Sequence, residues 1–467
     1  MSEPRLSEPC FSELELKSEL KANLKDLGYL NMTPIQAQSL PLVLAGKDVI
    51  AKAKTGSGKT AAFGVGLINR LEVRKYRVQG LILCPTRELA DQVSKELRRI
   101  ARALHNIKIL TLCGGMPFGP QIGSLEHGAH IVVGTPGRIL QHLRKGTLKI
   151  DAVSTLVLDE ADRMLDMGFV DDIREIAEKT PKQRQTLLFS ATYPESISEL
   201  SQQFQRQPQE VSVDTAHKEN TIEQYFFPVE QSQRDEALLS LIQHYQPQTA
   251  VIFVNTKRET EDVAGFLREQ GWSAQALHGD LEQKQRDQVL VCFSNNSCSF
   301  LVATDVAARG LDIKDLPCVI NYQVTRDAEV HVHRIGRTGR SGKSGLALNL
   351  FSDRERYKLE DIETYQNLPA EIVALDDLTP DANFHLEPQM ATIQLDGGRK
   401  AKIRPGDILG ALTGDFGIDG KLVGKIDIFN FHAYVALDTS IVNQALKGLQ
   451  SGKKIKGRTL KVRKLKL

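Results

Sequence analysis

The sequence predicts two consecutive α/β domains with parallel sheets, followed by a small α+β domain. Short apolar runs recur through the first 350 residues, and most end at once in a polar or Gly- and Pro-rich turn. Amphipathic stretches such as 88–104 and 260–271 lie between these runs. Fully apolar strands that alternate with helices are typical of parallel sheets covered on both faces. The last 78 residues have a different pattern and a strongly basic charge.

The predicted strands form two series. The first lies within 48–60, 81–89, 131–138, 155–162 and 186–192, and the second within 250–258, 300–310, 318–322 and 346–351. Polar sequence at 203–221 separates the series, and an acidic, Pro-containing stretch at 374–389 follows the second. These breaks predict a first domain over 1–210, a second over 211–373, a linker over 374–388 and a last domain over 389–467.

Composition limits the class of protein. Of 467 residues, 41% are hydrophobic and 25% charged, as in globular proteins. No apolar run approaches the roughly 18–20 residues that span a bilayer, and the start MSEPRLSEPC lacks the pattern of a signal peptide. The six cysteines show no metal-ligand spacing. We therefore expect a cytoplasmic protein with reduced thiols and no membrane partner.

A phosphate-binding loop is predicted at AKTGSGKT (53–60), between an apolar strand and a helical pattern. It fits the phosphate-loop motif except that Ala53 replaces the first Gly. Small residues let backbone N–H groups curl around phosphate oxygens at a helix start. Lys59 is expected to reach the β- and γ-phosphates and Thr60 to bind Mg²⁺. The nucleotide-binding residues predicted in this loop are Thr55, Gly56, Ser57, Gly58, Lys59 and Thr60.

Paired carboxylates end the predicted strand in TLVLDEAD (155–162). About a hundred residues after a phosphate loop, they suit an ATPase: Asp159 would bind Mg²⁺ and Glu160 would orient or deprotonate the attacking water. The alternative is an acidic turn in which these carboxylates only cap a helix.

Three arginines spaced by glycines occur in HRIGRTGR (333–340). Arginine is a fork-shaped donor suited to phosphate, and Gly permits close backbone approach. If the two α/β domains face each other, Arg337 and Arg340 would act on the γ-phosphate. A basic surface loop is the alternative.

The C-terminal segment predicts a nucleic-acid-binding domain. Residues 390–467 hold 15 Lys or Arg and six Asp, a net charge of +9 within a chain of total charge +2. The pattern predicts strands at 390–398 and 422–437, helices at 404–417 and 439–450, and a closing strand at 456–465. This is the β-α-β-β-α-β plan of an RNA-recognition motif. The aromatic signature of that motif is degenerate at 430–437, so Phe429 and Phe431 are expected in the core rather than as stacking platforms.

The ordered motifs resemble the DEAD-box ATP-dependent RNA helicases. They cover roughly residues 11–340 and include GYLNMTPIQ (28–36), AKTGSGKT, PTRELA (85–90), TPGR (135–138), DEAD (159–162), SAT (190–192), VIFVNT (251–256), ATDVAARGLD (303–312) and HRIGRTGR. The resemblance implies two tandem RecA-like domains, with a divergent RNA-recognition-motif-like domain behind them. The C-terminal domain looks like that of the bacterial DbpA group.

The resemblance also implies roles for further residues. Phe11 would stack on adenine, Gln36 would pair with its edge, and Asp312 would contact the ribose. Asp162, Ser190, Thr192 and His333 would couple the nucleotide state to strand separation. Residues implied to line the RNA path are Pro85, Thr86, Arg87, Gly115, Thr135, Arg138, Gly279, Arg286 and Thr304.

The expected activity is local, non-processive unwinding of short RNA duplexes with ATP and Mg²⁺. Closure of the two domains on ATP would form a groove that fits bent single-stranded RNA and excludes a duplex. The DbpA resemblance implies a target in structured 23S ribosomal RNA during large-subunit assembly. We expect a monomer that does not act on DNA. An ATP-gated RNA clamp that does not unwind remains an alternative, as does a DNA translocase; a phosphate-loop kinase leaves the second α/β domain without a purpose.

Overall fold

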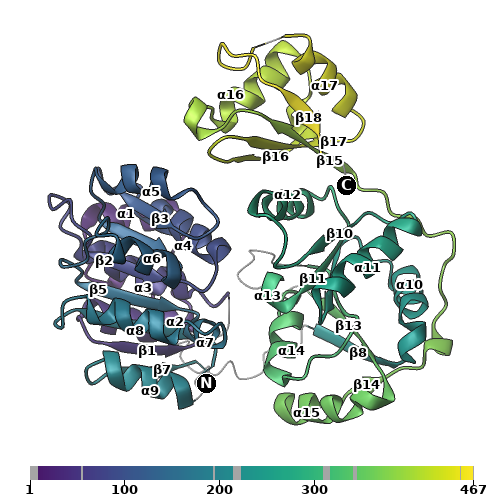
Figure 1. The fold of residues 1–467 in the computed structure, drawn as a ribbon, viewed down its shortest axis with the longest axis horizontal. Coiled ribbons are helices and arrows are strands. Elements are labelled where there is room, and N and C mark those ends of the chain that lie inside the picture. The colour runs from purple at the N-terminus through teal and green to yellow at the C-terminus, as the bar shows by residue number, and fades with distance from the viewer. Residues whose placement is uncertain are drawn as a thin grey trace, which may run out of the picture. The chain divides into compact units, whose positions relative to one another are not determined.

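The computed structural model describes residues 9–53, 56–192, 195–213, 222–308, 316–339, 344–452 and 454–465. Its described residues form two compact units, one before residue 217 and one after it (Figure 1). Each unit contains a seven-stranded sheet, and the second unit also holds a four-stranded sheet. The α/β fold class with two tandem parallel-sheet domains and a small α+β domain is therefore confirmed.

The sheet of the first unit has the strand order β3-β4-β2-β5-β6-β1-β7, and every pairing in it is parallel. Its strands are β1 (Val49–Lys52), β2 (Gly80–Leu83), β3 (Ile109–Leu112), β4 (Ile131–Gly134), β5 (Thr155–Asp159), β6 (Gln185–Ser190) and β7 (Gln209–Ser212). The helices are α1 (Ser18–Asp26), α2 (Pro34–Leu44), α3 (Lys59–Arg70), α4 (Arg87–Ile100), α5 (Phe118–Leu125), α6 (Pro136–Arg144), α7 (Ala161–Asp166), α8 (Val170–Glu178) and α9 (Glu195–Phe204).

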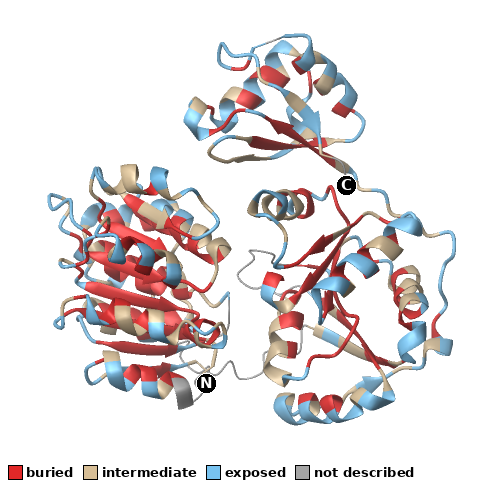
Figure 2. Ribbon diagram, in the orientation of Figure 1, coloured by how far each residue is buried: buried red, intermediate tan, exposed pale blue. Residues whose placement is uncertain are grey.

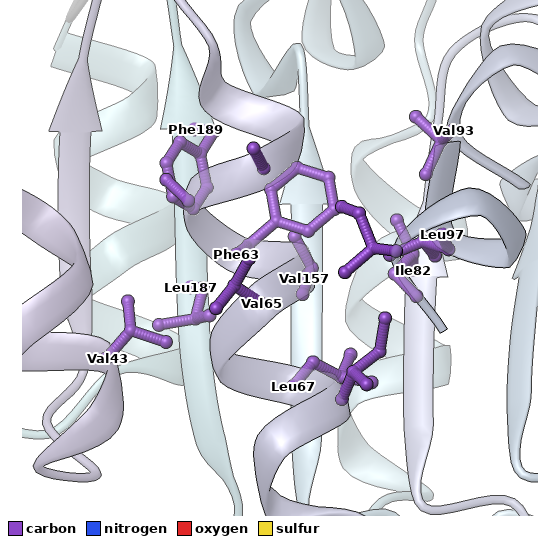
Figure 3. Packing of buried hydrophobic residues seen from close by; sticks show 14 of the residues in the cluster. Val43, Phe63, Val65, Leu67, Ile82, Val93, Leu97, Val157, Leu187 and Phe189 are labelled. Carbon is purple, nitrogen blue, oxygen red and sulfur yellow. The ribbon is translucent and has the colours of Figure 1, made fainter. Parts of the chain in front are cut away.

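Both faces of this sheet are buried, as the continuous apolar strands predict. Successive strand side chains point to opposite faces, so Leu187 and Leu188 of β6 lie in two different hydrophobic clusters. On one face, Phe63 of α3 packs edge-on against Phe189 of β6, with ring centroids 5.2 Å apart (Figure 3). Figure 2 shows that the central strands are buried while the helices alternate between buried and exposed residues; the edge strand β7 is mostly exposed. The rigid sheet thus fixes the positions of the loops that leave its carboxyl edge.

The large sheet of the second unit has the order β10-β11-β9-β12-β13-β8-β14, the same strand plan as the first. Its strands are β8 (Ile222–Pro228), β9 (Ala250–Val254), β10 (Ala274–Leu277), β11 (Phe300–Thr304), β12 (Cys318–Asn321), β13 (Gly345–Phe351) and β14 (Glu371–Ile372). The helices are α10 (Arg234–Tyr245), α11 (Lys257–Glu269), α12 (Gln283–Ser294), α13 (Asp305–Ala308), α14 (Ala328–Ile335) and α15 (Arg356–Gln366). Two successive domains of one plan were expected from the two series of apolar runs.

The C-terminal domain has the predicted β-α-β-β-α-β order. Its elements are β15 (Met390–Leu395), α16 (Pro405–Gly410), β16 (Val423–Ile428), β17 (Ala433–Asp438), α17 (Val442–Gln450) and β18 (Val462–Lys464). The antiparallel sheet has the order β16-β17-β15-β18, so the basic closing strand lies at an edge, three residues long. Leu460 and Val462 pack against the domain core while Lys461 and Arg463 are exposed, as the alternation predicts.

The prediction that Phe431 lies in the core is wrong, because its side chain is 58% exposed. Phe431 belongs to the turn between β16 and β17, where the chain reverses before the strand alternation resumes. Phe429 is half-buried and packs edge-on against Tyr434, with ring centroids 5.3 Å apart.

The segment predicted as a linker, 374–388, packs on the second α/β domain. Phe384 lies 5.5 Å from Trp272 between ring centroids, and Leu378 is buried in the same hydrophobic cluster. Backbone N–H groups of Thr379 and Asp381 donate to His244 and Gln243 at the end of α10. The boundaries given to the domains and the linker stay predictions.

The six cysteines are free in the structure, with five buried and Cys10 half-buried. No helix within the described residues is long and apolar enough to cross a membrane.

Candidate nucleotide and RNA sites

The predicted phosphate loop joins β1 to α3, and its described residues are 53 and 56–60. Gly56 and Gly58 have φ angles of 90° and 94°, in the left-handed region that favours glycine. Lys59 opens α3 and is buried, and its Nζ donates to the Ala53 carbonyl at 2.9 Å. Within the described residues, the buried Ser57 Oγ has no hydrogen-bond partner. These features suit a loop whose polar groups bind phosphate. Thr55, which is also predicted to bind nucleotide, lies outside the described residues.

Gln36 is held against this loop. It stands at the third position of α2, where its Oε1 accepts from the Thr33 backbone N–H at 2.9 Å and its Nε2 donates to the Gly58 carbonyl at 3.1 Å. An amide side chain has two donor hydrogens and a carbonyl with two lone pairs, so one of each remains for an adenine edge. The same amide explains why residue 58 is glycine, since a Cβ there would lie 2.3 Å from Gln36 Nε2.

We predict that Gly58→Ala weakens ATP binding at least about tenfold. The added methyl would displace Gln36, and a left-handed non-glycine backbone costs about 1–3 kcal/mol. Binding of a fluorescent ATP analogue measures the effect. Gly123→Ala on α5 is the matched control, because a Cβ there meets no atom within 4 Å. Wild-type affinity in Gly58→Ala would contradict the packing of Gln36 on this loop.

Phe11, expected on the adenine ring, is buried to 2% exposure in a short 3-10 turn (Phe11–Glu13). Its ring packs edge-on against Tyr29, with centroids 5.6 Å apart, and its backbone N–H donates to the Leu30 carbonyl at 3.0 Å. These contacts tie Phe11 to the segment that leads into Gln36. Its stacking on adenine stays a prediction.

The acidic motif lies where β5 passes into α7. Asp159 ends the strand, and burial raises its pKa to about 7, opposed by the attraction of Lys59 and increased by the neighbouring Glu160. Glu160 has φ 55° and ψ 55°, a left-handed conformation that is uncommon outside glycine and often marks functional positions. The Arg163 Nη1 donates to Glu160 Oε2 at 3.0 Å, and both side chains are buried.

The predicted Mg²⁺ ligands supply oxygen only, from the Thr60 hydroxyl and the Asp159 carboxylate. Mg²⁺ prefers oxygen donors, retains several waters and is commonly bound by one or two carboxylates together with substrate phosphates. A divalent cation would favour the ionised form of Asp159 and so oppose the effect of burial on its pKa. Within the described residues, no group of three His, Cys, Asp or Glu side chains could hold a metal. Thr60 and Asp159 thus fit Mg²⁺ as a companion of bound nucleotide.

Asp162 contacts the segment Ser190–Thr192, while its role in coupling stays a prediction. Its Oδ2 accepts from the backbone N–H groups of Ala191 and Thr192, each at 3.1 Å, and from the Thr192 hydroxyl at 3.0 Å. Its own backbone N–H donates to Ser190 Oγ at 3.4 Å. Burial opposes ionisation of Asp162, but Lys59 and these hydrogen bonds outweigh it and lower its pKa. A shift of 190–192 would therefore reach α7 directly.

The predicted RNA contacts of the first unit follow three adjacent strands. Residues 85–87 follow β2, Gly115 follows β3, and Thr135 and Arg138 follow β4. Because the sheet order is β3-β4-β2-β5-β6-β1, these loops occupy one half of the carboxyl edge. The loops after β1, β5 and β6 occupy the other half, and they hold the phosphate loop, the acidic motif and the predicted coupling residues. Part of the hydrogen-bonding capacity of Arg138 is used within the first unit, because its Nη1 donates to the Met116 carbonyl and to Gln121.

The second unit shows the same division. Gly279 follows β10 and Thr304 ends β11, the two strands at one side of the sheet. Arg286 on α12 spans their loops by donating to the carbonyls of His278 at 3.5 Å and Ala307 at 3.2 Å. Arg337 follows α14 and is buried, and His333 lies on α14 with its Nε2 4.0 Å from Glu329. Asp312 and Arg340 lie outside the described residues.

Arg334 is a residue that sequence reasoning missed. Its side chain is 1% exposed, and all five of its N–H groups are used. They donate to both Asp305 oxygens at 2.6 and 2.7 Å, to Asn321 and Asn255 side chains, and to the Gln323 carbonyl. Arg334 thereby fixes α14 to the carboxyl ends of β9, β11 and β12. No sequence signal could have paired it with residues up to 79 positions away.

One face of the C-terminal sheet is covered by the second α/β domain. Thr392 of β15 bonds with Asn295 at 3.1 Å and Ser297 at 2.8 Å, and Gln394 accepts from Gln288 of α12 at 3.0 Å. Ala433, Val435 and Leu437 of β17 belong to the core of the domain itself, while Tyr434 and Ala436, which pair with Gln394 and Thr392, are buried on this covered face. This is the face on which ordinary RNA-recognition motifs stack bases.

Exposed basic side chains gather instead on the loops at one end of this domain. We call this surface the basic end; it comprises Arg399, Lys400, Lys402, Arg404, Lys456 and Arg458. Three contacts hold its loops together. The Arg399 N–H donates to Phe429 O at 2.9 Å, the Lys400 N–H to Asn430 O at 3.0 Å, and Lys456 Nζ to Lys402 O at 2.7 Å. The exposed Phe431 follows Asn430 directly, so its backbone lies next to that of Lys400.

The fold and the site together define a nucleotide-driven enzyme that acts on RNA. Two tandem parallel-sheet domains carry a phosphate loop, paired carboxylates and arginines suited to phosphate, and a basic domain follows them. Three family models match: DEAD/DEAH box helicase over 33–200, helicase conserved C-terminal domain over 233–342, and DbpA RNA binding domain over 392–464. The chain belongs to the DEAD-box family of ATP-dependent RNA helicases, in its DbpA group.

Its relatives agree with this assignment. The chain is 54% identical to the ATP-dependent RNA helicase DbpA of Escherichia coli (strain K12), over 95% of this chain and 96% of that one. It is 44% identical to the DEAD-box ATP-dependent RNA helicase CshA of Geobacillus kaustophilus, over 76% of each chain. Among solved structures it is similar to S. cerevisiae Dbp5 bound to RNA and ADP BeF3, with TM-score 0.72, 28% identity, and coverage of 79% of this chain and 96% of that one.

Proposed function

We propose that this helicase unwinds short RNA duplexes locally, without processive movement, and that its C-terminal domain directs it to structured 23S ribosomal RNA during large-subunit assembly. The observation that carries the targeting is the basic end with Phe431, beside a sheet face that α12 covers. Six exposed cations suit phosphate groups of folded RNA, and one exposed ring suits a single unpaired base. The relative DbpA carries RNA helicase in its name, and the matching domain model is an RNA-binding one.

In the proposed cycle, the first unit binds ATP with Mg²⁺ through the phosphate loop, Thr60 and Asp159. Gln36 selects adenine, and Arg337 of the second unit, with Arg340, stabilises charge on the γ-phosphate. Mg²⁺ supplies charge neutralisation on the phosphates. Glu160 orients the attacking water, and Asp162 passes the nucleotide state to Ser190 and Thr192. Contacts of the RNA path go mostly to phosphate and 2′-hydroxyl groups, which predicts a core without sequence preference.

We further propose that the protein acts as a monomer in the cytoplasm on RNA and not on DNA. Free, mostly buried thiols suit a reducing compartment. ATPase stimulation by RNA and by DNA of matched sequence tests the choice of nucleic acid. Strand displacement with ATP, compared with a non-hydrolysable analogue, tests unwinding; RNA binding without displacement would instead mean an ATP-gated clamp.

The targeting is tested by substitution at the basic end of the full chain. We expect Phe431→Ala to weaken binding of a 23S ribosomal RNA fragment about tenfold, because stacking of one base on an aromatic ring is worth about 1–3 kcal/mol. Lys400→Ala should lower the salt dependence of binding by about one counterion. RNA affinity and the RNA concentration that half-saturates the ATPase are the measurements.

Substitution is preferable to truncation here, because removal of the domain would uncover α12 and its polar side chains. Tyr357→Ala is the matched control, since Tyr357 is an equally exposed aromatic at 55% on α15. If Phe431→Ala and Lys400→Ala bind every RNA as the control does, the basic end is not the targeting surface. If both lose affinity equally for 23S and unrelated RNA, the domain binds RNA but does not choose it.

A further inference from the structure

Glu160 and Arg163 form an ion pair inside the first unit. The Arg163 Nη1 lies 3.0 Å from Glu160 Oε2, and the side chain of Arg163 is 7% exposed and that of Glu160 is 6% exposed. A buried charge pair is retained only where geometry compensates for lost hydration. The sequence motifs do not assign Arg163 to ATP, metal or RNA. Its burial beside the acidic motif therefore needs another explanation.

The backbone makes the position of the Glu160 carboxylate depend on this pair. Glu160 precedes α7 with a left-handed φ of 55°, a conformation that a non-glycine residue keeps only where its surroundings hold it. Arg163 stands three residues later on the first turn of α7, and side chains at this spacing lie on the same side of a helix. The guanidinium therefore reaches back and holds one carboxylate oxygen.

We propose that Arg163 is a positioning residue for Glu160, holding Oε2 so that Oε1 is presented to the attacking water. This rests on the proposed role of Glu160 in ATP hydrolysis. Arginine suits the task because it only donates and stays protonated, so it cannot take the proton of the water. Removing it leaves the carboxylate free to rotate, and a small misplacement of a catalytic group slows a reaction severely.

The same short helix turn links this pair to the coupling segment. The Arg163 backbone N–H donates to Asp162 Oδ1 at 2.9 Å, while Asp162 Oδ2 accepts from Ala191 and Thr192. Thus Asp162 and Arg163 connect the segment 190–192 to Glu160 through adjacent residues. A change at 190–192 would move the residue that holds Glu160.

The test uses the full chain with Arg163→Met, which removes the charge and the donors at similar volume. We expect kcat of the RNA-stimulated ATPase to fall about 10–100-fold. The KM for ATP, the affinity for a fluorescent ATP analogue and the RNA concentration at half-saturation should change less than about twofold, because ground-state binding does not involve Glu160. Since a single N–H of Arg163 holds the carboxylate, Arg163→Lys should recover most of the rate.

Arg174→Met is the matched control. Arg174 also pairs with an acid three residues before it, Asp171, at the same 3.0 Å, but on the exposed side of α8. Its kcat should equal that of the wild type. If Arg163→Met shows the control's kcat while Glu160→Gln is inactive, the proposal is overturned and the role of Glu160 stands.

Two other outcomes would also decide whether Arg163 positions Glu160. If Arg163→Met loses kcat, ATP affinity and thermal stability together, and Lys does not restore the rate, the pair is structural and the proposal fails. If Glu160→Gln itself keeps RNA-stimulated turnover, the proposed role of Glu160 fails first, and that result differs from failure at Arg163.

Discussion

Glu160→Gln should abolish RNA-stimulated ATP turnover, with kcat falling about 10²–10⁴-fold, the usual contribution of a general base. Glutamine keeps the shape of the side chain, and its amide oxygen can still accept from Arg163, so the left-handed turn into α7 should persist. It lacks the negative charge that would attract and deprotonate water. ATP binding should persist, because the hydrogen bonds of Gln36 and Lys59 within the described residues go to Thr33, Gly58 and Ala53 and not to Glu160.

Two measurements separate loss of chemistry from loss of binding. Single-turnover ATP hydrolysis at saturating RNA gives the chemical step, and a fluorescent ATP analogue gives affinity, which should stay within about threefold of the wild type. The variant should also hold RNA more firmly in the presence of ATP, because hydrolysis is proposed to release the strand. Brisk RNA-stimulated hydrolysis in this variant would refute the assignment of Glu160.

Most strands with continuous β-branched or leucine-rich sequence were predictable, although β3, with the sequence ILTL, and β8, with IEQYFFP, were missed. All nine predicted runs contain a strand of the parallel sheets. β10, with the sequence AQAL, was missed because alanine and glutamine have little β propensity, and its neighbour β11 supplies the pairing. β14 has two residues and exists only as an addition to β8. Such elements are determined by tertiary context rather than by their own sequence.

The candidate site divides in the same way. Lys59, Asp159 and Glu160 were predictable because their chemistry is local to one loop or one strand end. The three-residue spacing of Glu160 and Arg163 is compatible with an ion pair. That spacing is also common on solvated helix faces, so it does not by itself predict a buried pair. The role of Arg334 could not be predicted from the sequence, because its partners come from three other strand ends. The burial of Gln394 and Thr392 against α12 depends on packing between domains, which no local pattern encodes.

Arg337 should be the second residue whose loss nearly stops turnover. We expect Arg337→Lys to lower kcat about 10³-fold, because an arginine finger is typically worth about 10³–10⁵ in rate. A lysine keeps the charge but loses the planar fork that binds two phosphate oxygens at once. The structure explains how the residue is held: its backbone N–H donates to the Arg334 carbonyl at 3.2 Å, and Arg334 is fixed by five hydrogen bonds.

The control is Arg326→Lys, an exposed arginine that precedes α14 in the same unit and should keep the wild-type rate. Thermal unfolding should be similar in both variants, since neither removes a charge. ATP affinity should fall far less than kcat, because the finger is proposed to act on charge that develops in the transition state. A kcat near that of Arg326→Lys would mean that Arg337 does not reach the γ-phosphate. An equal loss of kcat and of ATP affinity would mean that it binds the nucleotide without catalysing its cleavage.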